Sequence, residues 1–236
     1  EGTALALDTT SIGGGIYEMP YRPTPLTFTV DGKQYFNERP ISTQQTAFTF
    51  VSQLRSWLPR EIGGVLWFGN DDANMVAYTP VYCGNTVQPA CYNTKGADAV
   101  TFSSDNAFWL CNMVSNMVYP RYSQLFPELK AVRDSLETSY FANQTSIEKQ
   151  AADLYKTDKA AALKLLNNYS NTKADEMLAS WKRLATRIIV KYNDMAVKKT
   201  KDGKLVHSVV RPGYPASFAK KLVKETGDWY AVPAKK

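Results

Sequence analysis

The chain has 236 residues, with 28 Lys and Arg against 22 Asp and Glu, a net charge of +6 and a single histidine. Hydrophobic residues make up 44% and charged residues 21%, which excludes a disordered chain. No apolar run approaches the roughly 18 residues of a membrane span, and the lysine-rich last forty residues lack an aromatic-studded basic groove. We therefore expect one large domain or two small ones, no membrane span and no nucleic-acid binding.

The pattern of apolar residues and turn residues between residues 21 and 102 predicts β-strands. Residues 26–30 alternate with period two, and Asp31-Gly32 predicts a tight turn that makes a hairpin with residues 33–36. Residues 64–68 form a continuous apolar run bounded by glycines, which is typical of a central strand buried on both faces. Further strands are predicted over residues 48–51 and 76–82.

Two of the three cysteines, Cys83 and Cys91, lie eight residues apart across a turn-rich stretch. A disulfide is feasible there, and two free thiols are an equal alternative, because spacing alone does not fix the Cα geometry. Cys111 follows Phe108-Trp109-Leu110, a pattern typical of a buried core thiol. None of the three has a neighbouring base that would mark it as a nucleophile.

From about Asn106 the apolar period becomes helical, and helices are predicted over residues 108–118, 125–141, 146–155, 159–166, 173–199 and 215–225. Thr145-Ser146-Ile147-Glu148 has the pattern of a capping box at the start of the third. The fold class expected is α+β, with residues 1–105 as a β-rich half and residues 106–236 as a helical half of the same domain. A sheet with one uncovered face, and an abrupt start at Glu1, lead us to expect a missing partner segment.

The single histidine, His207, cannot supply a His-rich metal site, and it is the only possible His base for a Ser or Cys triad. It lies in a strand-like run over residues 204–210, which is typical of an ordinary surface or edge histidine. The sequence has no phosphate-binding loop of the G-x-x-x-x-G-K-[ST] or G-x-G-x-x-G type. We expect no cofactor and no metal.

The densest polar motif is Asn37-Glu38-Arg39-Pro40-Ile41-Ser42-Thr43-Gln44-Gln45-Thr46, between two apolar strands. A loop so rich in hydrogen-bonding side chains suits the wall of a pocket. A satisfied polar turn that caps the next strand is the alternative, and the sequence leaves both open.

This motif and its neighbours resemble the C-terminal half of the cysteine dipeptidases of peptidase family C69. The segments that carry the resemblance, in chain order, are residues 1–3, 21–26, 37–46, 55–59, 62–73, 82–84, 107–109, 191–194, 213–215 and 225–228. They include Arg55-Ser56-Trp57-Leu58-Pro59, Gly69-x-Asp71-Asp72-Ala73 and Gly213-Tyr214-Pro215. The ordered series covers essentially the whole chain.

The resemblance implies an N-terminal-nucleophile hydrolase, a four-layer αββα sandwich whose nucleophile is a cysteine at the mature N-terminus. The α-amino group of that cysteine serves as the base, since its pKa near ~8 lets it take the thiol proton at neutral pH. This chain begins with Glu1, so we expect the nucleophile upstream, in an N-terminal half or subunit that is the expected partner. No catalytic residue is expected in this chain, and no activity from it alone.

The resemblance also suggests pocket residues. Arg39 is a candidate to clamp a substrate carboxylate, with an ion pair to Glu38 or another local carboxylate as the alternative. Gln44 and Gln45 are candidates to hydrogen-bond the substrate backbone or the oxyanion, with strand capping as the alternative. Asp71 and Asp72 are candidates to bind a free substrate α-amine, with a surface turn as the alternative.

The leading hypothesis is therefore the C-terminal portion of a cysteine dipeptidase that hydrolyses small peptide amides. The alternatives are a non-catalytic binding module and an acylase that acts on non-peptide amides with the same fold. The feasible Cys83–Cys91 bridge and a turn-rich, Tyr-rich composition favour an exported or periplasmic bacterial protein over a cytoplasmic one. A homo-oligomer is compatible with this reading.

Overall fold

The computed structural model describes residues 17, 28–35, 42–94, 98–202, 204–206 and 216–233, which fold as a mixture of helices and antiparallel strands. The strands are β1 (Phe28–Val30), β2 (Lys33–Tyr35), β3 (Phe48–Leu54), β4 (Gly64–Asn70), β5 (Thr79–Tyr82), β6 (Thr200–Lys201) and β7 (Lys204–Leu205). The α-helices are α2 (Arg60–Gly63), α3 (Ala107–Val118), α4 (Tyr122–Tyr155), α5 (Lys159–Tyr192) and α6 (Ala216–Thr226). Short 3-10 helices are η1 (Ala90–Tyr92), η2 (Tyr119–Arg121), η3 (Asn193–Met195) and η4 (Gly227–Tyr230). An α+β class is thus observed.

The central sheet has the order β3-β4-β5, and both pairings are antiparallel. The predicted central position of this strand is confirmed, because β4 lies between β3 and β5. Its predicted burial on both faces is not, because Leu66 and Phe68 on one face are only half-buried. The predicted hairpin is confirmed as β1–β2, whose two turn residues Asp31 and Gly32 have φ of 49° and 75°. Positive φ at both turn positions is the geometry that Asp-Gly favours in a two-residue hairpin.

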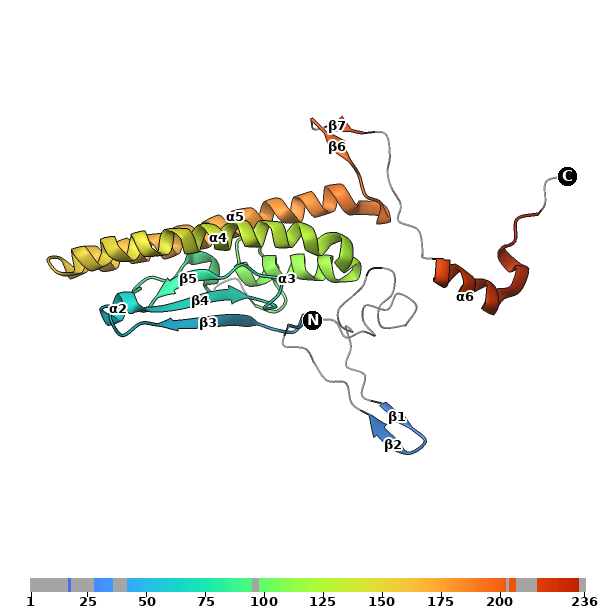
Figure 1. The fold of residues 1–236 in the computed structure, drawn as a ribbon, viewed down its shortest axis with the longest axis horizontal. Coiled ribbons are helices and arrows are strands. Elements are labelled where there is room, and N and C mark those ends of the chain that lie inside the picture. The colour runs from blue at the N-terminus through green and yellow to red at the C-terminus, as the bar shows by residue number, and fades with distance from the viewer. Residues whose placement is uncertain are drawn as a thin grey trace.

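Helices α4 and α5 are 34 residues each and lie side by side along one side of the sheet, with α3 beside them (Figure 1). The sequence predicted four shorter helices here. The predicted break between residues 155 and 159 is confirmed, whereas the breaks predicted at residues 142–145 and 167–172 were wrong. Residues 142–145 contain no Gly or Pro and continue the helix, so the capping-box pattern at Thr145 marks no helix start. The side chain of Glu148 forms an ion pair with Arg55, in the connection between β3 and α2, instead of capping a backbone N–H at a helix start.

Two apolar cores hold the helices to the sheet. The larger core joins the turn after β4 to α3, α4 and α5 around Trp181, which is fully buried. The smaller core joins the helix-facing side of the sheet to both long helices, and its members are Ile62, Val65, Trp67, Tyr82, Tyr140, Ala151 and Leu166. Each core combines residues from before and after residue 105. The division of the domain into a β-rich half and a helical half at residue 105 stays a prediction.

The opposite face of the sheet is apolar and largely uncovered by described residues. On β3 this face carries Phe48, Phe50 and Leu54, which are 55%, 52% and 79% exposed. Phe48 stacks on Phe68 of β4 with the ring centroids 6.0 Å apart. Aromatic and aliphatic side chains on the face of a sheet normally pack against another layer.

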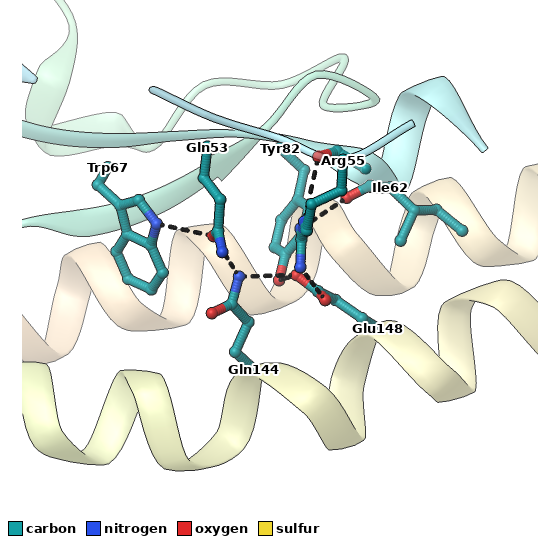
Figure 2. Close-up of polar contacts among 8 residues, drawn as sticks. Gln53, Arg55, Ile62, Trp67, Tyr82, Gln144 and Glu148 are labelled. Carbon is teal, nitrogen blue, oxygen red and sulfur yellow. Dashed lines mark hydrogen bonds and ion pairs between the residues drawn. The ribbon is translucent and has the colours of Figure 1, made fainter. Parts of the chain in front are cut away.

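A buried ion pair connects the end of β3 to the middle of α4 (Figure 2). The two terminal guanidinium nitrogens of Arg55 donate to the carboxylate of Glu148, at 2.5 and 2.7 Å. The side chains of Arg55 and Glu148 are 10% and 8% exposed. The same guanidinium donates to the carbonyl oxygens of Ile62 and Gly63, each at 3.3 Å. Arg55 therefore joins β3, the start of β4 and α4 through one side chain.

Glu148 accepts two further hydrogen bonds, from the hydroxyl of Tyr82 at 3.0 Å and the amide of Gln144 at 2.9 Å. The Gln144 amide also donates to Gln53 at 2.7 Å, and Gln53 accepts from the indole of Trp67 at 3.2 Å (Figure 2). Burial and the neighbouring Glu148 carboxylate raise the pKa of Tyr82, so its hydroxyl remains a donor. The buried carboxylate is thus satisfied by three donor side chains.

The C-terminal elements lie outside the two cores. The hairpin β6–β7, the helix α6 and η4 stand away from the sheet and the long helices (Figure 1). The predicted last helix is confirmed as α6. None of the helices in the described ranges is both long enough and apolar enough to cross a membrane.

Replacing Arg55 with Ala tests the ion pair. We expect Arg55→Ala to lower the free energy of unfolding by about 3–5 kcal/mol, because Glu148 would remain buried without its cation. Urea denaturation followed by circular dichroism measures this loss.

Lys156→Ala is the matched control, since it removes an ion pair with Asp153 whose members are 72% and 59% exposed. The urea midpoint of this variant should equal that of the parent. Equal losses in the two variants would contradict the role given to Arg55.

Candidate functional site

The turn that follows β4 has an unusual backbone. Asp71 has a φ of 81°, a left-handed conformation that few residues other than Gly, Asn and Asp adopt. The N–H of Asp71 donates to Ala47 O at 3.0 Å, which extends the pairing of β3 and β4. The carboxylate of Asp72 then accepts from the N–H of Asn74 at 3.0 Å, as the Asx turns formed by aspartate do. The sequence Asp71-Asp72 is therefore suited to this sharp turn.

The carboxyl group of Asp71 is fully buried. Its Oδ1 accepts from the amide of Asn112 on α3 at 2.9 Å, and its Oδ2 has no hydrogen-bond partner. Burial raises the pKa of Asp71 from 3.8 to about 6, against the lowering effect of the nearby Ser115 hydroxyl and the Asn112 amide. Burial therefore outweighs the two hydrogen-bonding groups in setting the pKa of Asp71.

Asp72 is also fully buried, but both of its carboxyl oxygens accept hydrogen bonds. The hydroxyl of Tyr119 in η2 donates to its second oxygen. Burial raises the pKa of Asp72, while the Tyr119 hydroxyl and the Asn74 N–H oppose the rise. The next residues extend the network, because Asn74 donates to the Tyr122 hydroxyl at 3.0 Å and accepts from Arg133 at 2.8 Å.

The loop of Gln44 and Gln45 lies against this turn. The hydroxyl of Ser42 accepts from the N–H of Asn74 at 2.9 Å, so residues far apart in the sequence meet at one end of the sheet. Within the loop, Thr43 donates to the side chain of Gln45 at 2.5 Å. Gln45 is exposed and Gln44 half-buried, which leaves both near the surface of this end.

The structure therefore brings together four of the five predicted pocket residues at the end of β4: Gln44, Gln45, Asp71 and Asp72. Arg39 lies outside the described residues. The alternative of a surface turn for Asp71 and Asp72 is wrong, because their side chains are fully buried. The sequence did not reveal their partners Asn112 and Tyr119, which lie on α3 and η2 and are distant in the chain.

The three cysteines are free, so the Cys83–Cys91 disulfide is not formed. Cys83 is exposed after β5, whereas Cys91 is buried in the larger core. Burial raises the pKa of Cys91 to about 12 and that of Cys111 well above its ordinary value. A nucleophilic cysteine needs its thiol pKa lowered, and these two environments do the opposite. Cys91 and Cys111 therefore behave as core residues.

The described part of the chain has no group of three His, Cys, Asp or Glu side chains that could hold a metal ion. Among the polar groups at the end of β4, the carboxyl groups of Asp71 and Asp72 are fully buried, whereas the side chains of Gln44 and Gln45 are half-buried and exposed and can reach a polar ligand.

Comparison with known proteins identifies the family. A model of peptidase family C69 matches residues 18–135, half of the chain, and the matched stretch contains the Ser42–Gln45 loop and the Asp71–Asn74 turn. The chain belongs to peptidase family C69.

Curated relatives carry the name probable dipeptidase B. The protein of that name from Streptococcus pyogenes serotype M1 is 23% identical over 154 residues, which cover 64% of this chain and 30% of the relative. Its counterpart from serotype M18 is 23% identical over 155 residues, with the same coverage. The chain thus spans about 30% of the length of the curated relatives it matches.

The raised pKa of Asp71 predicts a pH dependence of stability. A carboxyl whose folded pKa lies above its unfolded value stabilises the fold below about pH 4, and this contribution is lost as the pH rises through about 6. Asp71→Asn keeps the shape, tolerates positive φ and has no charge to bury. We expect Asp71→Asn to match the parent near pH 4 and to be more stable at pH 8, by up to about 3 kcal/mol.

Urea denaturation at half-unit steps from pH 4 to pH 8 measures the difference. Parallel stability curves for the parent and Asp71→Asn over that range would contradict the raised pKa of Asp71.

Proposed function

We propose that this chain is the C-terminal portion of a cysteine dipeptidase, which cleaves small peptide amide bonds with a nucleophile that lies outside these residues. The observation that carries the proposal is membership of peptidase family C69, together with the likeness to proteins named probable dipeptidase B. The buried, raised-pKa thiols of Cys91 and Cys111 support an outside nucleophile.

In the proposed reaction, an upstream N-terminal cysteine loses its thiol proton to its own α-amino group. The thiolate attacks the peptide carbonyl carbon, and the carbonyl oxygen becomes an oxyanion. The C–N bond then breaks, the ammonium group protonates the leaving amine, and a thioester remains. Water attacks the thioester with the α-amine as base, which releases the acid and the free thiol. No metal or cofactor takes part in these steps.

The contribution of this chain is proposed to be one wall of the substrate pocket, formed by the loop and turn at the end of β4. Gln44 and Gln45 are proposed to donate hydrogen bonds to the substrate backbone or the oxyanion, where preorganised donors have the largest effect on rate. The exposure of Gln45 and the partial exposure of Gln44 support this role. Arg39, five residues before Gln44, is proposed to bind the substrate carboxylate through paired N–H donors.

For Asp71 and Asp72 the geometry favours a positioning role over direct binding of a substrate amine. Their carboxyl groups face α3 and η2, and both are fully buried. The turn they shape presents the Asn74 N–H to Ser42, and this hydrogen bond holds the Gln44–Gln45 loop to the end of the sheet. Asp71 and Asp72 are therefore proposed to fix the pocket wall rather than to contact the substrate.

The αββα sandwich is proposed from the uncovered apolar face of the central sheet. This face carries Phe48, Phe50 and Leu54 on β3 and Phe68 on β4, with the helices on the other side. Two sheets that pack face to face bury side chains of this kind between them. The portion with the nucleophile would supply the second sheet and its outer helices.

The three cysteines of this chain provide the test. In the complete enzyme, the triple variant Cys83→Ser, Cys91→Ala, Cys111→Ala should keep kcat for a dipeptide substrate within about threefold of the parent. Steady-state hydrolysis of a dipeptide panel measures this, with circular dichroism as the check on folding.

Loss of more than a hundredfold in kcat with folding intact would place the nucleophile in this chain and overturn the proposal. Turnover of acyl-amides without turnover of any dipeptide would replace the dipeptidase by an acylase of the same fold.

A further inference from the structure

Strand β3 is an open edge of the central sheet. It pairs with β4 over all seven of its residues, and the sheet order of the described residues gives it no second partner. Its sequence, Phe-Thr-Phe-Val-Ser-Gln-Leu, has no charge and no proline. Edge strands of stable monomers usually carry such protective features, because a bare edge recruits another strand. The edge of β3 therefore has the features of a strand that pairs with another strand.

The outward-facing backbone groups can be assigned from the ladder. The N–H of Arg55 donates to Gly63 O, and the carbonyl of Ala47 accepts from Asp71 N–H, so residues 47 and 55 both face β4. The register between them is unbroken. Antiparallel strands alternate the direction of their backbone groups, so Phe48, Phe50, Ser52 and Leu54 direct their N–H and C=O groups to the open edge.

A groove follows this edge on the helix-facing side. It has a volume of about 350 Å³ between β3, β4 and α4, and its walls include Val51, Gln53, Trp67, Glu137, Phe141 and Gln144. The rings of Trp67 and Phe141 have their centroids 4.7 Å apart, and Phe141 is 54% exposed. Gln53 and Gln144 are joined by a hydrogen bond, and the Trp67 indole donates to Gln53 beside them (Figure 2). The groove is thus apolar and aromatic with amide groups at one end.

Glu137 adds a negative charge to this groove. It is half-buried, and its carboxylate accepts from the N–H of Tyr78 at 3.0 Å. In the part of the chain described, no Lys or Arg forms an ion pair with it. The guanidinium of Arg133, one turn earlier on α4, is bound to Asp134 and to the carbonyl of Asn74. The charge of the groove therefore has no direct counter-ion.

We propose that the edge of β3 and its groove bind an extended peptide segment in which apolar side chains alternate with Lys or Arg. The backbone of the segment would pair with the outward groups of Phe48, Phe50, Ser52 and Leu54, as in strand addition. Its basic side chain would lie in the groove, with the methylene stem along Phe141 and Val51 and the charge at Glu137. The apolar side chains of the segment would lie beside Phe48 and Phe50, on the face of the sheet opposite the helices.

A second copy of this chain fits the same edge less well. Two β3 strands paired with each other would bring only Thr49, Val51 and Gln53 to the helix-facing side. None of these is cationic, so Glu137 would be covered without a counter-charge. The charge of the groove favours a segment with a basic residue. This inference is independent of the dipeptidase reaction.

A synthetic heptapeptide that alternates valine and lysine is the probe, labelled with a fluorophore at one end. The control peptide has glutamate in place of lysine. Burial raises the pKa of Glu137, so fluorescence anisotropy is measured at pH 8 to keep its carboxylate ionised. We expect the lysine peptide to bind at least tenfold more tightly than the glutamate peptide, and Glu137→Gln to reduce this ratio to about threefold or less.

Ser52→Pro tests the backbone pairing, because it removes one outward N–H without touching the ladder to β4. Ser52→Ala is the matched control, since it keeps that N–H. Affinity for the lysine peptide should fall at least tenfold in Ser52→Pro and stay within twofold in Ser52→Ala. If Ser52→Pro does not fold, a heptapeptide with N-methylated backbone should show the same loss against the parent protein.

Equal affinities of the lysine and glutamate peptides, or no saturable binding of either, would overturn the inference. Dimerisation of the parent chain that Ser52→Pro abolishes would also overturn it, in favour of a second copy at this edge.

Discussion

The ion pair of Arg55 and Glu148 is the interaction on which the arrangement of sheet and helices depends. It is the one place where a charged side chain from the sheet and one from α4 are buried together, within the residues that the structure describes. A buried pair adds little to stability over an apolar equivalent, but removing one partner is costly, so it selects one arrangement. Because Glu148 also binds Tyr82 and Gln144, a rotation or shift of α4 would break several hydrogen bonds at once. The pair therefore fixes the register of α4 against β3 and β5.

That register has consequences at both ends of β4. At one end, Arg55 holds the chain where α2 leads into the strand. At the other, α3 and the start of α4 close over the turn of Asp71 and Asp72, through Asn112, Tyr119 and Tyr122. The left-handed backbone and buried carboxyl of Asp71 both raise the free energy of the fold. Unfavourable features of this kind persist where the surrounding contacts impose them, and here they hold the loop of Gln44 and Gln45 in place.

The sequence predicted local features well because local chemistry decides them. Asp31-Gly32 can turn with two positive φ angles, glycines bound the apolar run of β4, and the helical period begins at Asn106, where the structure starts α3. Prediction from the sequence failed where a residue distant in the chain determines the local structure. Glu148 has the spacing of a capping residue, yet Arg55, 93 residues away, binds it, and the predicted helix boundary disappears. The burial of Asp71 likewise depends on Asn112 and Ser115, whose positions no local pattern encodes. Of the pocket residues, the loop and the turn were recognised by family resemblance, and their contact through Ser42 and Asn74 required the structure.

The central proposal is that this chain forms the scaffold and pocket wall of a cysteine peptidase whose nucleophile lies elsewhere in the protein. The most direct measurement is to treat the native, active sample with a dipeptide-based electrophile that alkylates the catalytic thiol, and to locate the label by intact mass and peptide sequencing. The account predicts a single label on an N-terminal cysteine outside these 236 residues. A label on Cys83, Cys91 or Cys111, with loss of activity in proportion, would contradict it.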